Sequence, residues 1–122
     1  MNPPIKITAL NLEIYGNDIS AVTWQKAHKF AYMIGGGWRL PNLMELRIIK
    51  TIRDIGSVGN FPTYTTFDDS YYWSSQEGEG ITARSTGSDG TSRYAYFFDM
   101  KNGEFRDNKK SYDLRVRFVR SI

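Results

Sequence analysis

Carboxylates and one histidine are the side chains in this sequence that could support catalysis. A pair of carboxyl groups can hydrolyse a glycosidic bond when a cleft holds the two at a fixed separation. His28 is the only histidine and cysteine is absent, so nucleophile–base pairs have little to build on. We predict that the protein is not an enzyme and that its clustered acids are solvated loop residues, namely Asp68, Asp69, Glu77, Glu79 and Asp89.

Metal and cofactor sites find little support in the residue pattern. Calcium takes six to eight oxygen ligands, several of them carboxylates, and thiolate sites need the cysteine that the chain lacks. The glycines at 35–37 follow a predicted helix, and no Lys-Ser or Lys-Thr pair comes after them, so they do not form a phosphate-binding loop. His28, without a second histidine, is predicted to be a partly exposed helix residue. The sequence predicts no metal and no cofactor.

Two polar segments are the candidates for recognition. Residues 76–92 are rich in glycine and serine, and loops of this length are uncommon in compact domains unless they are functional or mobile. Residues 56–70 form a second polar stretch. Tyrosine and arginine are frequent interface anchors, and loops commonly carry function on a rigid scaffold. We predict contact residues at Tyr71, Arg84, Asp89, Arg93 and Tyr94, with a surface excursion of no role as the alternative.

A glycine-rich corner separates two predicted helices. Glycine readily closes a helix, and Pro41 cannot continue one. Asn42 suits the N-cap of the next helix, and Glu45 stands three residues on, where it completes a capping box. Trp38 and Trp73 are predicted to be core residues rather than binding residues. The structural motif therefore consists of Trp38, Arg39, Leu40, Pro41, Asn42, Glu45 and Trp73.

Three short motifs occur in order along the chain. Gly-Trp-Arg-Leu-Pro-Asn spans residues 37–42 with Glu-Leu at 45–46, Tyr-Trp-Ser-Ser spans 72–75, and Val-Arg-Phe-Val-Arg spans 116–120. From about Thr23 to its C-terminus, the chain resembles the bacterial domain family named after the C-terminal domain of the Lcl collagen-like adhesin. That family resembles the C-type-lectin fold and is a distant structural relative of formylglycine-generating enzymes.

The resemblance implies a fold and a class of ligand. It implies an α+β, C-type-lectin-like domain with two helices packed on an antiparallel β-sheet. Family members occur on adhesins that meet host glycans, which implies an anionic glycan as a first ligand. Formylglycine-generating relatives use cysteines, and calcium-dependent lectins use Glu-Pro-Asn, Gln-Pro-Asp and Trp-Asn-Asp motifs. This chain has neither, because serines follow Trp73, so neither activity is implied.

Periodicity predicts the elements that position these residues. Apolar residues at helical spacing predict helices over 20–34, capped by Ser20 or Thr23, and over 43–55. Alternation and aromatic density predict strands over 5–10, 12–15, 71–75, 93–99, 104–106 and 114–120, with a hairpin turn at 100–103 and a polar turn at 107–110. Hydrophobic residues make up 40% of the chain, so we expect one folded domain over residues 1–122.

Charge and termini bear on partners. Residues 101–122 hold seven Lys/Arg against three acids, a basic stretch that either attracts an anionic partner or consists of solvent-facing arginines on a strand, the reading we favour. Nucleic acid is a poor fit because the net charge is only +3. No signal segment or membrane span is present, so we expect a cytoplasmic or phage-particle location unless a leader was removed. We therefore predict a protein or glycan partner, with an intracellular or phage-encoded protein-binding factor as the alternative function; self-association stays open.

Overall fold

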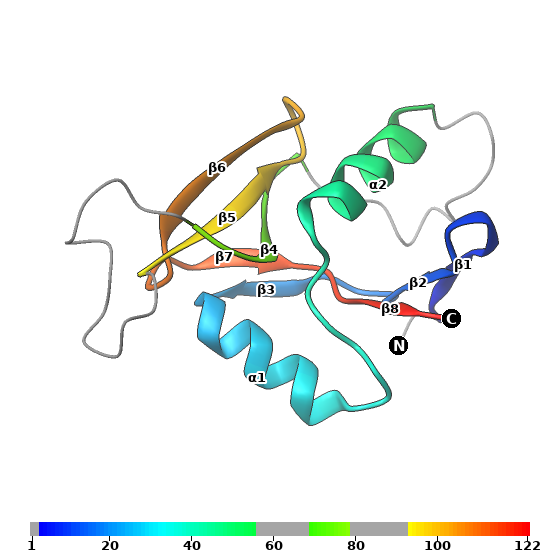
Figure 1. The fold of residues 1–122 in the computed structure, drawn as a ribbon, viewed down its shortest axis with the longest axis horizontal. Coiled ribbons are helices and arrows are strands. Elements are labelled where there is room, and N and C mark those ends of the chain that lie inside the picture. The colour runs from blue at the N-terminus through cyan, green and yellow to red at the C-terminus, as the bar shows by residue number, and fades with distance from the viewer. Residues whose placement is uncertain (1–2, 56–68, 79–92) are drawn as a thin grey trace.

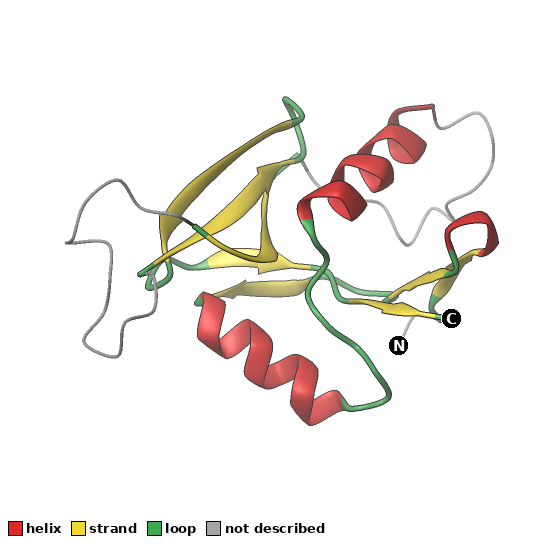
Figure 2. Ribbon diagram, viewed as in Figure 1, coloured by secondary structure: helices red, strands yellow, loops and turns green. Residues whose placement is uncertain are grey.

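The computed structural model describes residues 3–55, 69–78 and 93–122 (Figure 1). Within them, helices and strands combine as an α+β arrangement, which confirms the predicted class (Figure 2). In chain order the elements are β1 Ile5–Ile7, a 3-10 helix Thr8–Leu10, β2 Leu12–Ile14, β3 Ile19–Val22, α1 Trp24–Ile34, α2 Leu43–Ile55, β4 Tyr71–Glu77, β5 Tyr94–Asp99, β6 Glu104–Lys109, β7 Leu114–Val116 and β8 Val119–Ser121. The N- and C-terminal strands share one sheet, and both chain ends lie on the same side of the molecule.

The described strands form two sheets. The larger has the order β3-β7-β4-β5-β6, and the smaller has the order β1-β2-β8. The closing segment, predicted as one strand over 114–120, is two strands, because Arg117 and Phe118 carry the chain from one sheet to the other. The prediction of an antiparallel sheet is wrong for β4 and β7, which pair in parallel with Tyr72 opposite Arg115. Alternation of apolar residues looks the same in both kinds of pairing, so the sequence carries no signal for this difference.

Two hydrophobic clusters lie on opposite faces of the central strands. Tyr72 and Phe98 belong to the cluster that contains α2 residues, whereas Trp73 and Phe97 belong to the cluster that contains α1 residues. Successive strand residues point to opposite faces, so the neighbours Tyr72 and Trp73 contribute one ring to each cluster, and so do the neighbours Phe97 and Phe98. Trp73 is fully buried, which confirms it as a core residue. In Figure 1, α1 and α2 accordingly lie on opposite sides of the strands.

The first helix is shorter than predicted. It begins at Trp24, with the Thr23 hydroxyl accepting a hydrogen bond from the Lys26 backbone N–H over 3.4 Å. Thr23 is therefore the cap and Ser20 is not. The preceding residues form β3, because Ile19 and Val22 pair with β7 and join the hydrophobic cluster under α1. β-branched residues favour this extended conformation over a first helical turn.

Other boundaries differ where local sequence signals are weak. The first predicted strand ends at Ile7 and continues as a 3-10 helix. The predicted turn over 107–110 begins only at Lys110, because β6 runs to Lys109 and pairs with β5 over its whole length. Pairing with a hydrophobic neighbour can hold a polar edge strand that its own composition does not predict. The hairpin turn at 100–103 is confirmed, with Gly103 at a φ of 75°.

The corner between the helices confirms the predicted capping box. The Glu45 backbone N–H donates to Asn42 Oδ1 over 2.7 Å, and the Asn42 N–H donates to Glu45 Oε1 over 2.8 Å. Arg39 adds a bidentate pair, since its two terminal nitrogens each lie 2.8 Å from a Glu45 carboxylate oxygen. Leu40 and Pro41 are buried beside this network. The motif thus fixes the start of α2.

Candidate binding site

Three of the five predicted contact residues, Tyr71, Arg93 and Tyr94, lie in the described part of the chain. Arg84 and Asp89 lie outside the described residues, as do most of the two predicted recognition loops. Tyr71 begins β4 opposite the last residue of β5, whereas Tyr94 is the first residue of β5. Five residue steps of β5 separate the two positions, or about 17 Å along an antiparallel strand. The structure therefore leaves Tyr94 beside Arg93 and separates Tyr71 from both.

Arg93 and Tyr94 lie where the chain re-enters the larger sheet. The Gly78 N–H donates to the Tyr94 carbonyl over 2.8 Å, and the Lys110 N–H donates to the Arg93 carbonyl over 2.9 Å. A Cβ at Gly78 would stand 2.8 Å from the Asp107 Cβ and 2.9 Å from the Tyr94 Cβ. A larger residue would push these neighbours aside, so glycine permits the close approach. Backbone contacts thus hold both sides of the re-entry point.

A lysine packed on an aromatic ring supports this end of the sheet. Lys110 Nζ lies 4.3 Å from the centre of the Trp24 ring and 3.4 Å from Glu77 Oε1. The Trp24 indole N–H donates to the Ser74 carbonyl over 2.8 Å, which fixes the ring. Because the Lys110 side chain is only 10% exposed, the ring face and the carboxylate compensate its charge. We refer to Trp24, Glu77, Gly78, Arg93, Tyr94 and Lys110 as the sheet-end site.

His28 lies one helical turn after Trp24, and their ring centroids are 4.3 Å apart. The residue is partly exposed, as predicted, but its Nε2 is buried and has no hydrogen-bond partner among the described residues. Burial lowers the pKa of His28 and the positive charge of Lys110 lowers it further, while Glu77 acts in the opposite direction. The imidazole beside the sheet-end site therefore stays neutral to a lower pH than a free histidine.

The chemistry of the sheet-end site suits binding. Arg93 is exposed and Tyr94 is partly exposed, and the two residues are consecutive where β5 begins. A guanidinium can donate two parallel hydrogen bonds to a carboxylate, sulfate or phosphate.

Among the described residues, no group of three or more His, Cys, Asp or Glu side chains could hold a metal ion. No described helix is long and apolar enough to cross a membrane.

The sequence does not reveal the supporting residues of this site. Glu77 belongs to β4 and not to the predicted loop over 76–92, and Lys110 lies in the turn that follows β6. Trp24 is predicted only as part of an apolar helix stripe. These three residues lie far apart in the chain and meet through tertiary packing, so no local spacing could have identified them.

The other candidate surfaces are closed by internal contacts. Arg117 is 2% exposed and its Nε lies within 2.6 Å of Asp18, while Arg115 contacts the same carboxylate at 3.4 Å. Arg120 pairs with Glu13 at 2.8 Å. The favoured prediction of solvent-facing arginines on the closing strands is therefore wrong for Arg117. Arg117 lies in the connection between β7 and β8, where its side chain is buried and the Asp18 carboxylate compensates its charge.

Trp38 corrects a second prediction. It is partly buried rather than a full core residue, and it packs against the cluster under α1. The Arg120 guanidinium lies 4.3 Å from its ring centre, and Tyr15 makes an edge contact with a centroid distance of 5.0 Å. The glycine corner before it leaves the ring at the edge of the molecule, where a cation covers one face.

Comparison with known proteins places the chain among C-type-lectin-like folds. Botrocetin has a TM-score of 0.60 at 12% identity, covering 99% of this chain and 98% of that one. EMS16, an antagonist of the collagen receptor integrin alpha2beta1, has a TM-score of 0.60 at 8% identity, covering 98% and 97%. The snake venom toxin convulxin has a TM-score of 0.60 at 9% identity, covering 98% and 95%. These likenesses confirm the predicted fold and, at such low identity, show the fold alone.

Sequence comparison gives the family. No curated protein sequence matches the chain significantly. The family model for the Lcl C-terminal domain matches residues 9–120, which confirms the resemblance and extends it upstream of Thr23 to the first strands. The chain belongs to the Lcl C-terminal domain family and has a C-type-lectin-like fold.

Proposed function

We propose that this domain is a non-enzymatic binding domain that recognises a partner protein through the sheet-end site. The observation that carries the proposal is that Arg93 is exposed while the backbone beside it is held, because the Lys110 N–H donates to the Arg93 carbonyl and Lys110 itself packs on Trp24 and pairs with Glu77. A preorganised support reduces the ordering cost that binding must overcome. Arginine and tyrosine are also the residue types that most often dominate interface energies.

Relatives in fold support the class of function. EMS16 is described as an antagonist of an integrin, and botrocetin is known in complex with the A1 domain of von Willebrand factor. Those partners belong to the venom proteins. Since one fold hosts many functions, the likeness supports partner binding in general and does not identify a ligand for this chain.

The charge of the site favours an acidic group on the partner. Arg93 forms no ion pair among the described residues, whereas Lys110 beneath it is already paired with Glu77. A guanidinium donates hydrogen bonds to a protein carboxylate or to a glycan sulfate with the same geometry. An anionic glycan, which the adhesin resemblance implies, is therefore the second candidate. Recognition in either case extends to the predicted loops over 56–70 and 76–92.

Charge reversal at one exposed arginine tests the proposal. Biotinylated wild-type chain is used for quantitative capture from a lysate of the source organism and, separately, on an array of sulfated glycans. We expect Arg93→Glu to weaken capture of the partner by about tenfold or more, which corresponds to about 1.4 kcal/mol. Arg106→Glu is the matched control, because that side chain is 61% exposed on the neighbouring strand.

The outcomes separate the candidates. Loss of protein capture in Arg93→Glu alone supports the partner-protein function, and loss of array signal alone supports the glycan. Unchanged binding of every ligand by Arg93→Glu, with a normal melting temperature, would remove the sheet-end site from the account. An equal loss in Arg106→Glu would show a general charge effect and contradict it as well.

A further inference from the structure

The outer face of α1 exposes apolar side chains that the core does not use. Tyr32 is 86% exposed and Met33 is 68% exposed, both in the last helical turn. Ala27 and Ala31 point the other way and are buried in the cluster under the helix. In a folded domain, adjacent apolar side chains exposed to this extent indicate an interaction surface more often than scattered single ones do.

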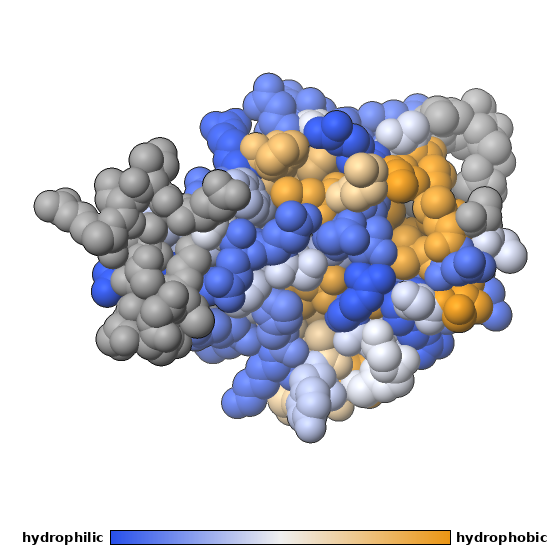
Figure 3. All heavy atoms as spheres, in the orientation of Figure 1, coloured by the Kyte–Doolittle hydropathy of each residue, from blue (hydrophilic) through white to orange (hydrophobic). Residues whose placement is uncertain are grey.

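Lysines extend this face toward the start of the helix. Lys26, Lys29 and Met33 stand three and then four residues apart, and Tyr32 stands three residues after Lys29, so helical geometry places them along one side. All four are exposed. In Figure 1 the helix ends at the lower tip of the molecule, and in Figure 3 that edge carries hydrophilic residues beside pale and orange ones.

The charge on this face is not compensated by the described part of the chain. Residues 24–34 contain two lysines, one histidine and no acid. None of the ion pairs between described residues includes Lys26 or Lys29. A partner that approaches this side therefore gains from negative charge opposite the lysines.

This pattern selects among occupants. A second copy docked through the same face would bring lysines of both chains together, which is unfavourable. A helix that lies on a membrane exposes apolar residues along its whole length, whereas the large apolar residues that α1 exposes occupy only its last turn. An acidic protein surface with an apolar depression matches both halves of the face.

We propose that the α1 face, defined by Lys26, Lys29, Tyr32 and Met33, is a docking surface for an acidic partner protein. Partner carboxylates lie opposite the two lysines. Tyr32 and Met33 enter an apolar depression on the partner, as anchors of a helix laid into a groove. The inference does not depend on the sheet-end site, because none of these four residues belongs to it.

A random-peptide phage library panned on the intact chain provides the probe. We expect enriched peptides that combine Asp or Glu with at least one large apolar residue. The double variant Lys26→Glu/Lys29→Glu should bind them about tenfold more weakly or worse, and added salt should weaken binding to the wild type. The matched control Lys6→Glu/Lys101→Glu makes the same charge change at two exposed lysines outside α1 and should bind as the wild type does.

A second variant tests the apolar half. Tyr32→Ser/Met33→Ser should also lose peptide binding by about tenfold while melting as the wild type does, since both side chains are exposed. Enrichment of peptides without acids, or equal binding by the wild type and both α1 double variants, would overturn the proposal. A membrane would be the better occupant if the wild type sedimented with phosphatidylserine-containing vesicles, Lys26→Glu/Lys29→Glu did not, and no acidic peptide were selected. That result would also overturn the proposal. The Arg93→Glu variant should bind the selected peptides normally, which keeps this test separate from that of the sheet-end site.

Discussion

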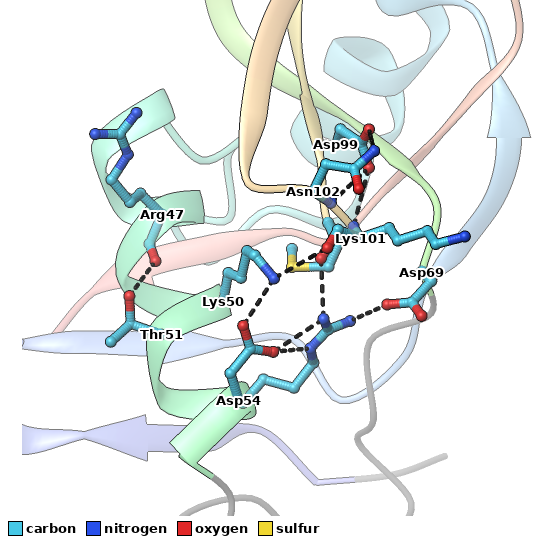
Figure 4. Close-up of polar contacts among 10 residues, drawn as sticks. Arg47, Lys50, Thr51, Asp54, Asp69, Asp99, Lys101 and Asn102 are labelled. Carbon is cyan, nitrogen blue, oxygen red and sulfur yellow. Dashed lines mark hydrogen bonds and ion pairs between the residues drawn. The ribbon is translucent and has the colours of Figure 1, made fainter.

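The two helices differ in how their charged residues are paired. On α2, Lys50 lies 2.7 Å from Asp54, and Arg53 lies 3.0 Å from both Asp54 and Asp69 (Figure 4). Lys50 and Arg53 also donate to the carbonyls of Lys101 and Met100. These contacts connect the helix to the hairpin after β5. On α1, no such ion pair exists among the described residues.

Two similar amphipathic helices can therefore have different roles, one in stability and one in binding. Charged groups on α2 are satisfied within the protein, so a partner would have to replace existing contacts to use them. The lysines on α1 form no ion pair with a carboxylate in the described part of the chain. We therefore expect mutations of polar residues on α2 to change stability, and mutations of exposed residues on α1 to change binding.

The largest expected effect comes from the core beneath α1. Trp73→Ala removes a fully buried ring whose indole N–H donates to the Val22 carbonyl over 2.9 Å. Denaturant unfolding should show a loss of about 3–5 kcal/mol. Tyr32→Ala is the exposed aromatic comparison and should change stability by less than about 0.5 kcal/mol. A Trp73→Ala variant that unfolds like the wild type would show that this core has been misassigned.

The next effect concerns the start of α2. Glu45→Ala removes both the pair with Arg39 and half of the capping box, so we expect a loss of about 1–2 kcal/mol at neutral pH. Asn42→Ala, which keeps the Arg39 pair, should lose about 1 kcal/mol and leave partner binding intact. Chemical denaturation of both variants checks this ranking. A larger loss in Asn42→Ala would contradict the importance of the Arg39 pair.

Glu45 also predicts a response to acid. Burial alone would raise its pKa, but hydrogen bonds from Arg39 and the Asn42 N–H outweigh burial and hold the pKa below the ordinary 4.5. Because its pKa is lowered in the folded state, the contribution of Glu45 to the free energy of unfolding is complete above pH 4.5. That contribution is lost as the pH falls through the pKa of the folded state. Acid titration of unfolding free energy should therefore fall less steeply in Glu45→Gln than in the wild type. Parallel curves would contradict this assignment.

His28 should give a smaller effect at milder pH. Its pKa lies below the ordinary 6.5 because burial, and then Lys110, disfavour the charged form. The unfolded chain takes up a proton first, so stability is complete above pH 6.5 and declines as pH falls toward the folded pKa. The His28→Leu variant should lose this part of the decline between neutral and mildly acidic pH. Melting curves across that range measure it, and an unchanged decline would assign it to other groups.

The smallest expected effect compares one lysine on each helix. Lys50→Ala breaks the ion pair with Asp54, one helical turn away, and should lower the free energy of unfolding by about 0.3–0.5 kcal/mol at low salt. Lys29→Ala breaks no ion pair among the described residues and should change stability less. Measuring both variants at low and high salt sharpens the comparison. A salt-sensitive loss in Lys29→Ala would reveal a pairing that the α1 account does not contain.

Local signals predicted the elements better than the site. The capping residues Asn42 and Glu45 and a regular apolar spacing gave α2 the same bounds that the structure shows. β3 was missed, because its pairing with β7 arises from residues about 95 positions away. The sheet-end site depends on Trp24, Glu77 and Lys110 meeting across three elements, and no spacing in the sequence predicts that meeting.

Hydroxyl-radical footprinting of the chain with its captured partner shows whether the partner binds at the sheet-end site and the α1 face or on the α2 side. The method reports the exposure of aromatic and sulfur-containing side chains, and such side chains are present at each of these places. Binding through the sheet-end site and the α1 face predicts protection of Tyr94, Tyr32 and Met33. Met44 is 65% exposed and Phe105 is 47% exposed beside α2, and both should stay reactive. Protection of Met44 and Phe105 without protection of Tyr94 would place recognition on the α2 side and contradict the account.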